Sequence, residues 1–440
     1  MLGMKRNVVL ALAVAAAVAA PGAFATTGYF SHGYSMKEKG MAGTGVAFAQ
    51  DALAAATNPA GMVMVGNRMD AGVALFSPLR EYSTAGAPSG GLGTFPIAPY
   101  MGGTVESDNE LFLIPNFGRN WMLDANSSVG LSIYANGGMN TKWKAEDTGP
   151  GAPGVFSSGP GGFGLGDGTA GVDLAQMFFS GTYARKMSST SSWGASVIFA
   201  YQKFKAYGLE TFGGFSSDPS NLSNNGYDDS TGFGLKVGVQ GEVSPGISLG
   251  ASYQSEIAMG ELDKYKGLFA EQGDFDIPAT ANVGLAWKTS PASVLTFEIQ
   301  KIWYSKVNSV GNPMMPNLVP GSLGTSGGPG FGWKDIDIFR LGYQWESSPG
   351  MTWRVGYIDN DQPIASSEVL FNILAPAVQE QHITFGLTKQ MDKNSEFTFA
   401  AMYSPEEKVS GPNPLEAPGA QTIELKMKQY ELGVAWGWKF

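Results

Sequence analysis

The chain has 440 residues, a formal net charge of −10 and no cysteine, which excludes disulfides and thiolate metal sites. An acidic chain without a basic stripe also argues against a nucleic-acid partner. Charged residues make up only 15% of the sequence, whereas 61 residues are glycine. Soluble domains carry about 25% charged residues, so this composition favours a β-barrel membrane protein over a soluble α/β fold.

The first 25 residues have the organisation of a secretory signal peptide. Lys5 and Arg6 form the charged start, an apolar stretch follows from Val8 to Ala20, and Ala23 and Ala25 supply the small residues of a cleavage site. An apolar stretch of about 13 residues is shorter than the ~20 that a membrane-spanning helix needs. We therefore predict that residues 1–25 are a cleaved signal peptide.

The next segment, residues 26–67, has no period-two pattern and is dominated by small residues. A short helix is expected near residues 47–56. A compact segment with few charges, placed between an export signal and the first predicted strand, fits inside a barrel lumen. We predict that residues 26–67 form a plug, or hatch, and that residues 68–440 form the barrel.

The remainder of the chain alternates between apolar and small or polar residues, as strands with two different faces do. In one example, Phe339, Leu341 and Tyr343 alternate with Arg340 and Gly342. The predicted strands are 69–76, 110–118, 127–136, 173–186, 191–203, 231–242, 246–256, 279–289, 292–303, 335–347, 350–358, 380–390, 395–404 and 422–440. The count is fourteen, and an even number is what a single-chain bacterial barrel requires. The fold class predicted is an all-β membrane protein, a 14-stranded antiparallel transmembrane β-barrel with an N-terminal hatch in the lumen.

The connections between these strands alternate between short turns and long segments. Residues 244–246 and 347–350 are short turns, whereas 204–230 and 304–334 are long and rich in Gly, Pro and Ser. Short periplasmic turns and long extracellular loops are typical of outer-membrane barrels. This pattern predicts a multi-pass protein of the outer membrane of a Gram-negative bacterium, with both termini in the periplasm.

The last predicted strand has one wholly apolar face that includes Trp436, Trp438 and Phe440. Aromatic residues gather at membrane interfaces, so this face is expected to meet lipid near the periplasmic surface. The terminal aromatic resembles the signal for outer-membrane assembly. The expected partners are outer-membrane lipid and lipopolysaccharide and the barrel assembly machinery, and we expect a monomer.

Several motifs in order resemble one family. Gly40-Met41-Ala42-Gly43-Thr44-Gly45, Asp51-Ala52 and Asn58-Pro59-Ala60-Gly61 are similar to the hatch of the FadL/TodX (OMPP1) outer-membrane transporters, and Ile114-Pro115-Asn116 and Arg354-Val355-Gly356-Tyr357 extend the resemblance into the barrel. The resemblance implies passive, plug-gated capture of long-chain fatty acids or hydrocarbons in an apolar lumen pocket, then lateral release through a gap in the wall. It implies a transporter without enzymatic activity, cofactor or metal.

Within this resemblance we predict two hatch features. Tyr29 and Phe30 are expected near the ligand, although Gly28-Tyr29-Phe30 departs from the usual Gly-Phe opening of the family. The turn at Asn58, Pro59 and Ala60 is expected to keep the hatch closed. The alternative for both features is a hatch with a purely structural role.

Two further sets of barrel residues are candidates. Gly137 and Gly138 follow the third strand and are expected to form the kink of a lateral opening, the alternative being the start of an ordinary loop. By parity, Lys236, Arg340 and Arg354 face the lumen, where they either bind a substrate carboxylate or pair with lumen acids such as Glu298 and Glu346.

Two other functions are compatible with a barrel. A non-specific diffusive porin would have no need of a plug. An outer-membrane hydrolase would need a base beside a nucleophile, and His382 with Ser366 or Ser367 forms no recognisable motif. The choice among fatty acid, alkane, aromatic hydrocarbon and terpenoid as substrate stays open at this point.

Overall fold

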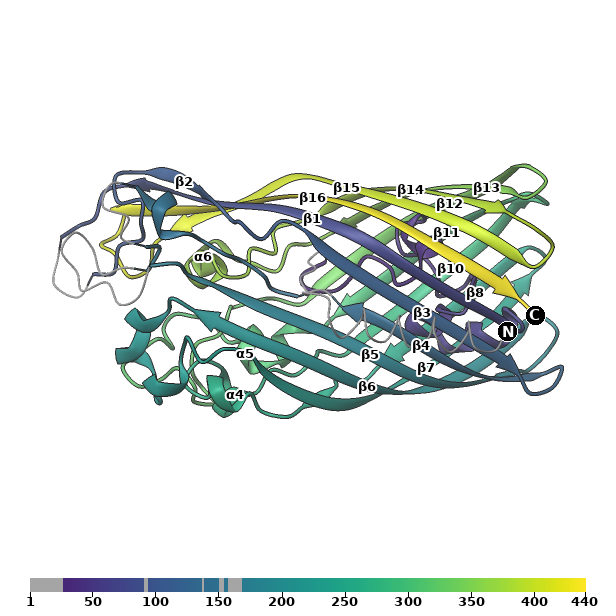
Figure 1. The fold of residues 1–440 in the computed structure, drawn as a ribbon, viewed down its shortest axis with the longest axis horizontal. Helices are drawn as coiled ribbons and strands as arrows, with labels where there is room; N and C mark the ends of the chain where they lie inside the picture. The colour runs from purple at the N-terminus through teal and green to yellow at the C-terminus, as the bar shows by residue number, and fades with distance from the viewer. Residues whose placement is uncertain (1–26, 91–93, 137, 150–153, 157–167) are drawn as a thin grey trace, which may run out of the picture.

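The computed structural model describes residues 27–90, 94–136, 138–149, 154–156 and 168–440, so the predicted signal peptide lies outside the described residues. Within them, sixteen strands form one sheet that closes on itself through a pairing of β16 with β1 (Figure 1). Two of these strands are short additions, because β2 pairs only with β1 and β9 only with β7. The other fourteen form a closed antiparallel barrel, which confirms the predicted fold class.

The fourteen barrel strands are β1 (Arg68–Gly86), β3 (Phe112–Met122), β4 (Ser127–Asn136), β5 (Gly171–Lys186), β6 (Ser191–Tyr207), β7 (Asp228–Ser244), β8 (Ile247–Gln254), β10 (Thr280–Ser290), β11 (Ser293–Ile302), β12 (Ile336–Ser348), β13 (Met351–Asn360), β14 (Gln381–Gln390), β15 (Ser395–Pro412) and β16 (Gln421–Lys439). The short additions are β2 (Gly103–Glu106) and β9 (Ala258–Met259). The helices of the long connections are η2 (Ala145–Thr148), η3 (Glu210–Phe215), η4 (Pro219–Asn221), η5 (Asp263–Tyr265), α4 (Ala270–Gly273), η6 (Tyr304–Lys306), α5 (Asn308–Gly311), η7 (Ser366–Glu368) and α6 (Val369–Asn372). None of the helices in the described part of the chain has the length and apolar character to cross a membrane.

The main departure from the predicted strands is the length of the seam that closes the barrel. β1 continues to Gly86, ten residues beyond the predicted end at residue 76, and pairs with β16 from Arg68↔Lys439 to Gly86↔Gln421. The alternation is hard to read in this extension because it contains Pro78 and charged side chains. The extended part of the seam lies at the long-loop end of the molecule (Figure 1).

The two faces of the barrel differ as the period-two pattern predicts. Outward side chains such as Leu235, Val237 and Leu341 are apolar and exposed, whereas their neighbours Lys236 and Arg340 point inward and are buried. An apolar outer surface with a polar lumen is the arrangement that a membrane-spanning barrel requires.

The segment that precedes β1 lies within the lumen. We call residues 27–67 the hatch; it contains α2 (Met36–Lys39), α3 (Ala54–Thr57) and η1 (Pro59–Met64). Its helices contact β14, β15 and β16 on one side and β4, β5, β6 and β7 on the other. The hatch occupies the half of the barrel that carries the short turns and the C-terminus, here called the short-turn half (Figure 1). The opposite, long-loop half holds the helices of the long connections.

Candidate functional site: the lumen and a break in its wall

The hatch is attached to the barrel by hydrogen bonds from inward polar side chains to its backbone. Glu298 of β11 accepts from the amides of Gly45 and Val46 at 3.0 Å each. The other strand residues that bond the hatch backbone include Asn120 to Met62, Ser132 to Ala52, Ser192 to Ala60, Ser252 to Thr57 and Thr384 to Ala42. The hatch has little regular structure of its own, so these bonds satisfy backbone groups that would otherwise be buried without partners.

A ring of inward glycines lets the hatch backbone approach the wall. On ten different strands, a Cβ added to one glycine would lie less than 3.0 Å from a hatch atom. These residues, the glycine ring, are Gly118, Gly130, Gly194, Gly238, Gly250, Gly284, Gly342, Gly356, Gly386 and Gly433. At Gly250 the added carbon would lie 2.0 Å from the backbone oxygen of Val46. Six of them face hatch backbone within this distance, namely Gly118, Gly194, Gly250, Gly342, Gly356 and Gly386, and the other four face hatch side chains. The hatch is therefore in close contact with the wall around most of the circumference.

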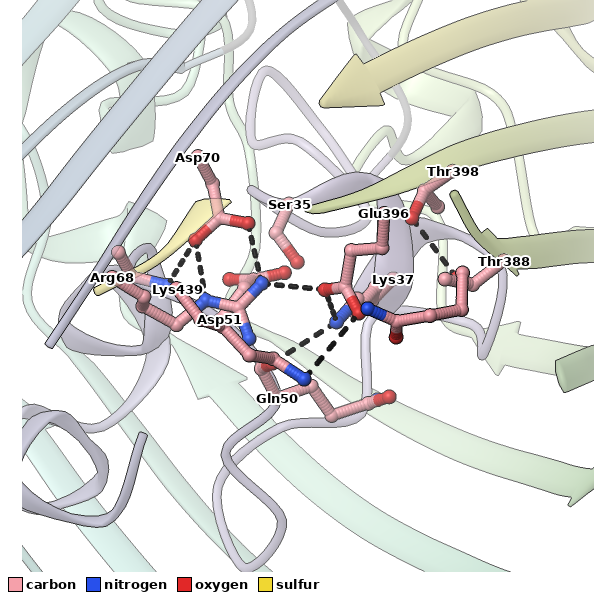
Figure 2. Close-up of polar contacts among 12 residues, drawn as sticks. Ser35, Lys37, Gln50, Asp51, Arg68, Asp70, Thr388, Glu396, Thr398 and Lys439 are labelled. Atoms are coloured by element: carbon pink, nitrogen blue, oxygen red, sulfur yellow. Dashed lines mark hydrogen bonds and ion pairs between the residues drawn. The ribbon is translucent and has the colours of Figure 1, made fainter. Parts of the chain in front are cut away.

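A cluster of buried ion pairs fixes the hatch at the short-turn end (Figure 2). Glu396 of β15 lies 2.5 Å from the ammonium of Lys37 in the hatch and 2.6 Å from the guanidinium of Arg68. Arg68 also pairs with Asp70, whose carboxylate accepts from the amide of Ala52. The side chains of Lys37, Arg68, Asp70 and Glu396 are less than a tenth exposed. One carboxylate thus joins the hatch to the first residue of the barrel.

The three candidate carboxylate-binding cations all lie against the hatch or its partners. Lys236 donates to the backbone oxygen of Ala56. Arg354 donates to the side chain of Gln50 at 3.0 and 3.2 Å, and Arg340 lies 3.4 Å from Glu298. The other acid considered as a partner, Glu346, is exposed and caps a short turn instead. Substrate binding by these cations stays a prediction, and in this structure each cation has a protein partner.

The Asn58–Pro59–Ala60 turn begins η1. The Asn58 side chain accepts from the amide of Ala60 at 3.0 Å, and its amide group donates to the backbone oxygens of Val46 and Val239. Pro59 occupies the first helical turn, where its missing N–H costs nothing. Asn58 therefore connects two parts of the hatch to strand β7.

Tyr29 and Phe30 lie where the hatch meets the long-loop half, in the buried apolar cluster of the lumen. The Tyr29 ring packs against Tyr304 and Trp333, with centroid distances of 5.1 and 5.8 Å. The amide of Tyr29 also donates to the Tyr304 hydroxyl at 3.2 Å. The start of the hatch is thereby part of the apolar lumen that the long connections line.

The long-loop half contains an apolar pocket. The space between its wall atoms, open solvent included, is about 520 Å³. Aromatic and aliphatic side chains line it, among them Phe204, Phe212, Phe331, Phe371 and Leu374. No charged side chain is among its described lining residues, so it suits an apolar ligand.

A second, small cavity, with about 210 Å³ between its wall atoms when open solvent is included, lies between the hatch and the end of β4. Tyr29 and Gly138, two of the predicted site residues, both line it, together with Trp333 and Arg80. Gly137, the other predicted kink residue, lies outside the described residues. The small cavity therefore joins the predicted ligand-contacting residue to the predicted kink.

The barrel wall is broken next to this cavity, between β3 and β4. Their ladder runs from Met122↔Ser128 to Phe117↔Ile133 and ends there. Beyond it, residues 112–116 of β3 pair only with β1, and residues 134–136 of β4 pair only with β5. Pro115 lies in the unpaired stretch, and a proline cannot donate a ladder hydrogen bond. A proline is tolerated in a strand that lacks a neighbour on one side, as β3 does here.

Strand β4 also bends toward the lumen at this break. Ala135 has the outward parity of its strand, yet it is 6% exposed and belongs to a buried cluster with the inward residues Phe112 and Ile114 of β3. Farther along, Asn136 pairs with Gln176 but Asn140 pairs with Asp173. Asn136 and Asn140 are four residues apart, whereas their partners Gln176 and Asp173 are three residues apart. The segment between Asn136 and Asn140 therefore has one residue more than the partner strand. A bulge with a bend is the local geometry that glycine there favours.

Three of the residues that shape this region were given no role there from the sequence, although Pro115 and Trp333 belong to motifs that resemble the family. Arg80 and Trp333 line the small cavity, and Pro115 marks the break in the ladder. Pro115 carried a signal, because a proline in the middle of a predicted central strand argues for missing pairing. Arg80 and Trp333 carried none that parity alone reveals, since their neighbours come from distant connections.

His382 is inward and buried, as its parity predicts. Its ring stacks on that of His32 in the hatch at 6.4 Å between centroids, and His32 lies 3.9 Å from Glu431. The described residues contain no group of three or more His, Cys, Asp or Glu side chains that would hold a metal. The histidine pair thus belongs to the contact between hatch and barrel.

Comparisons with known proteins agree with this architecture. A family model described as outer membrane protein transport protein (OMPP1/FadL/TodX) matches residues 13–428. Among solved structures, the toluene transporter TodX of Pseudomonas putida has a TM-score of 0.67 at 17% identity, covering 93% of this chain and 99% of that one. A Pseudomonas aeruginosa FadL homologue has a TM-score of 0.66 at 15% identity, covering 94% and 100%.

The toluene transporter TbuX of Ralstonia pickettii is also similar, with a TM-score of 0.60 at 15% identity, covering 93% of this chain and 99% of that one. A search of curated proteins found no match. At these identities the solved structures establish the fold, and the family model establishes membership. The chain belongs to the OMPP1/FadL/TodX family of outer-membrane transport proteins.

Proposed function

We propose that the protein takes up hydrophobic small molecules, of the fatty-acid or hydrocarbon class, by capture in the apolar lumen and lateral release through the wall. The observation that carries this proposal is the juxtaposition of the small cavity with the break between β3 and β4. The solved relatives named above include toluene transporters and a FadL homologue, which supports the same substrate range.

Capture follows from the apolar cavity of the long-loop half. Removing a hydrocarbon chain from water contributes about 0.8 kcal/mol for each buried CH₂. The apolar pocket lined by Phe204, Phe212 and Phe331 provides such an environment without a polar cost. The long loops face the cell exterior in this proposal, so the ligand enters there and both chain ends lie in the periplasm.

The hatch closes the straight route through the barrel. The glycine ring, the ion pairs of Glu396 and the Asn58 bonds attach the hatch around the lumen, which leaves little room for a continuous water path. The Asn58–Pro59–Ala60 turn keeps it closed in this proposal. A molecule in the small cavity therefore leaves more readily through the wall than past the hatch.

Lateral release uses the break between β3 and β4. A wall opening at membrane depth costs little where its backbone faces protein or an apolar ligand, because no polar group is then left bare in lipid. The bend of β4 toward the lumen places its bulge beside the cavity that Tyr29 and Gly138 line. An apolar molecule that crosses here enters the outer leaflet directly and avoids the aqueous periplasm.

Uptake by a deletion strain tests the function itself. Cells lacking the gene should take up labelled fatty acids, alkanes, aromatic hydrocarbons or terpenoids more slowly for at least one class, and the wild-type gene should restore the rate. Equal uptake of every class with and without the gene would contradict the proposal. Steady ion conductance of the purified protein in a planar bilayer would instead support a diffusive porin.

An engineered disulfide tests the lateral route. The chain has no cysteine, so Ile114→Cys with Ala135→Cys introduces one unambiguous pair across the break. Oxidation should lower uptake at least fivefold, and a reductant should restore it, because a covalent bond holds β3 against β4. The control pair is Trp121→Cys with Val129→Cys, which are already paired in the ladder. Unchanged uptake with a fully formed disulfide at the break would contradict lateral release there.

A further inference from the structure

We propose that a pocket on the outer surface of the barrel binds a phosphate group of lipopolysaccharide, through neighbouring cationic side chains and a divalent cation held by carboxylates. The pocket lies on the extended part of the seam between β1 and β16; its lining includes Glu81, Glu106, Glu110, Glu406, Lys426 and Lys428. We call it the seam pocket. The inference goes beyond the uptake function and does not depend on what the lumen carries. It uses only the orientation in which the long loops face the cell exterior.

The seam pocket lies at the height expected for lipid headgroups. On β16 every outward residue from Trp438 to Tyr430 is apolar or aromatic, and the next two outward residues are Lys428 and Lys426. The ring of Tyr430 lies 5.3 Å from that of Tyr403, and aromatic residues mark the membrane interface. From Trp438 to Lys428 the strand rises about 33 Å along its own axis, or roughly 25 Å across the membrane at a tilt of about 40°. An apolar band is about 25 Å tall, so the first lysine stands where the headgroups begin.

The charges around the pocket are separated by sign across the strands. One row of cross-strand neighbours, from β15 through β16 and β1 to β2, consists of Lys408, Lys426, Glu81 and Glu106. Lys426 pairs with Glu81 at 2.9 Å and with Glu424 at 3.5 Å. Glu81 and Glu106 are direct cross-strand neighbours, and like charges in such positions destabilise a sheet. A divalent cation between these two carboxylates would remove the repulsion.

The side chains of Lys428 and Glu110 make no ion pair or hydrogen bond within the part of the chain that the structure describes. Both line the seam pocket, one on each side of the sign boundary. An ammonium group binds a phosphate as a compact point charge. Mg²⁺ is commonly held by one or two carboxylates together with phosphate oxygens. A phosphate with its divalent cation therefore suits both kinds of unpaired charge.

Arg80 lines the pocket from the lumen side of β1. It is 3% exposed, and one of its terminal nitrogens donates to the backbone oxygen of Asn109 at 3.3 Å. The other terminal nitrogen has no hydrogen-bond partner among the described residues. A buried charge is unfavourable unless it is paired, so this guanidinium also indicates an anion that comes from outside the chain.

Lipopolysaccharide supplies the groups that this pocket lacks. Its lipid A moiety carries phosphates at headgroup height, and divalent cations link these phosphates in the outer leaflet. The cavity volume of about 100 Å³ is several times what a single water molecule needs. The described residues contain no group of three or more acids that would hold a metal alone, so the lipid phosphate completes the cation site. A soluble phosphate would approach the carboxylates against repulsion, whereas a lipid phosphate is already kept at this height by its acyl chains.

Binding of fluorescent rough lipopolysaccharide to purified protein in phosphatidylcholine nanodiscs tests the inference, in calcium and in EDTA. Wild type should bind in calcium, and EDTA should weaken binding about tenfold. Lys428→Gln should weaken binding in calcium about fivefold or more, because a charge-assisted bond to phosphate is lost. Glu106→Gln should weaken it similarly and should make the remaining binding insensitive to EDTA.

The matched control is Lys301→Gln. Lys301 is an outward lysine of β11, away from the seam, and its partner is Asp337 at 3.0 Å. Its loss should leave affinity for lipopolysaccharide within about twofold of wild type, because an exposed pair contributes little. Heat-modifiable electrophoretic mobility and thermal unfolding check the barrel of each variant. Should Lys428→Gln fail to fold, Glu106→Gln on the other side of the pocket decides.

Two competitors identify the source of the phosphate. Unlabelled rough lipopolysaccharide should displace the probe, whereas the dephosphorylated form and inorganic phosphate should not. Displacement by inorganic phosphate would assign the pocket to a soluble anion and would overturn the inference. Equal affinity of wild type, Lys428→Gln and Glu106→Gln, or wild-type binding that EDTA leaves unchanged, would overturn it as well. The uptake assay decides the proposed function separately, because these variants leave the lumen residues unaltered.

Discussion

The two halves of the lumen differ in the side chains that line them: charged and polar in the short-turn half, aromatic in the long-loop half. In the short-turn half, buried charges and backbone groups are paired across the gap between hatch and wall, as with Lys37, Arg68 and Glu396. In the long-loop half, aromatic rings such as Phe204 and Phe212 surround empty volume. Polar pairing gives a close, directional fit that resists opening, whereas apolar surfaces accept a ligand without leaving polar groups unsatisfied. One half of the barrel is thus suited to holding the hatch closed, and the other is suited to binding an apolar ligand.

The largest effect is expected from breaking the ion pairs of the short-turn half. Glu396→Ala leaves Lys37 and Arg68 without a shared carboxylate and should destabilise the protein by about 3–5 kcal/mol. Guanidinium unfolding in detergent measures this loss. Glu424→Ala is the matched control, because its ion pairs with Lys408 and Lys426 are open to solvent and the change should be within about 1 kcal/mol. A loss below 1 kcal/mol for Glu396→Ala would show that the cluster does not hold the hatch.

A bulky side chain in the glycine ring should separate hatch from wall. Gly250→Leu places atoms where Val46 now lies, so we expect a cost of about 1–3 kcal/mol and a rise in ion conductance. Planar-bilayer recordings measure the conductance. Gly181→Ala on β5 serves as the control, because nothing lies within 4 Å of its added Cβ. A silent Gly250→Leu channel with normal stability would argue against backbone-distance contact.

A substitution in the long-loop half should change ligand binding and leave the closure intact. Phe212→Ala removes one aromatic wall of the large cavity and should weaken binding of a hydrophobic ligand roughly tenfold, since a buried aromatic side chain contributes about 1.5–3 kcal/mol. Ion conductance should stay at the wild-type level. Ligand titration and bilayer recording on the same preparation measure both. Increased conductance would show that the two halves are not independent.

The smallest effect concerns the pH dependence of the hatch. Burial raises the pKa of Glu38 to about 8, and the neighbouring Asp51 adds to this rise. A carboxyl pKa that is higher in the docked hatch than its usual value near 4.3 favours docking while the group is protonated. That contribution is complete below about pH 4 and is lost as pH rises through about 8.

Hydrogen exchange of hatch amides, corrected for intrinsic rates, measures this dependence. Between pH 5 and 9 the opening equilibrium should rise more steeply in wild type than in Glu38→Gln, because only wild type carries the carboxyl that ionises in this range. The Gln side chain keeps an acceptor for the Thr57 hydroxyl, so the comparison isolates the charge. Identical pH profiles would remove Glu38 from the control of the hatch.

The barrel was predictable because a membrane allows few solutions. Every strand must place apolar residues outward, which produces an alternation with a period of two. This alternation can be recognised in a single sequence, without an alignment of relatives. The same parity put Lys236, Arg340 and Arg354 in the lumen. It does not identify their partners, because Ala56 and Gln50 lie in the aperiodic hatch, some 180 and 304 residues away in sequence.

The cavities were beyond the reach of sequence patterns for the same reason. Their walls come from connections without periodicity, and Trp333 reaches Tyr29 only through the packing of the entire lumen. Arg80 stands beside Glu81 in the sequence and reads as ordinary surface charge. The sequence shows glycines at inward positions of the strands. It does not show why they are small, because the reason is the hatch that faces them.

The long seam between β1 and β16 has a consequence for biogenesis. The hatch contacts strands on both sides of this seam, yet the chain encloses it completely once Arg68 reaches Lys439. A segment in such close contact with a closed wall has little room to enter afterwards. We therefore expect the hatch to be in place before the last strand docks, so that β16 pairs with β1 around a segment that is already inside.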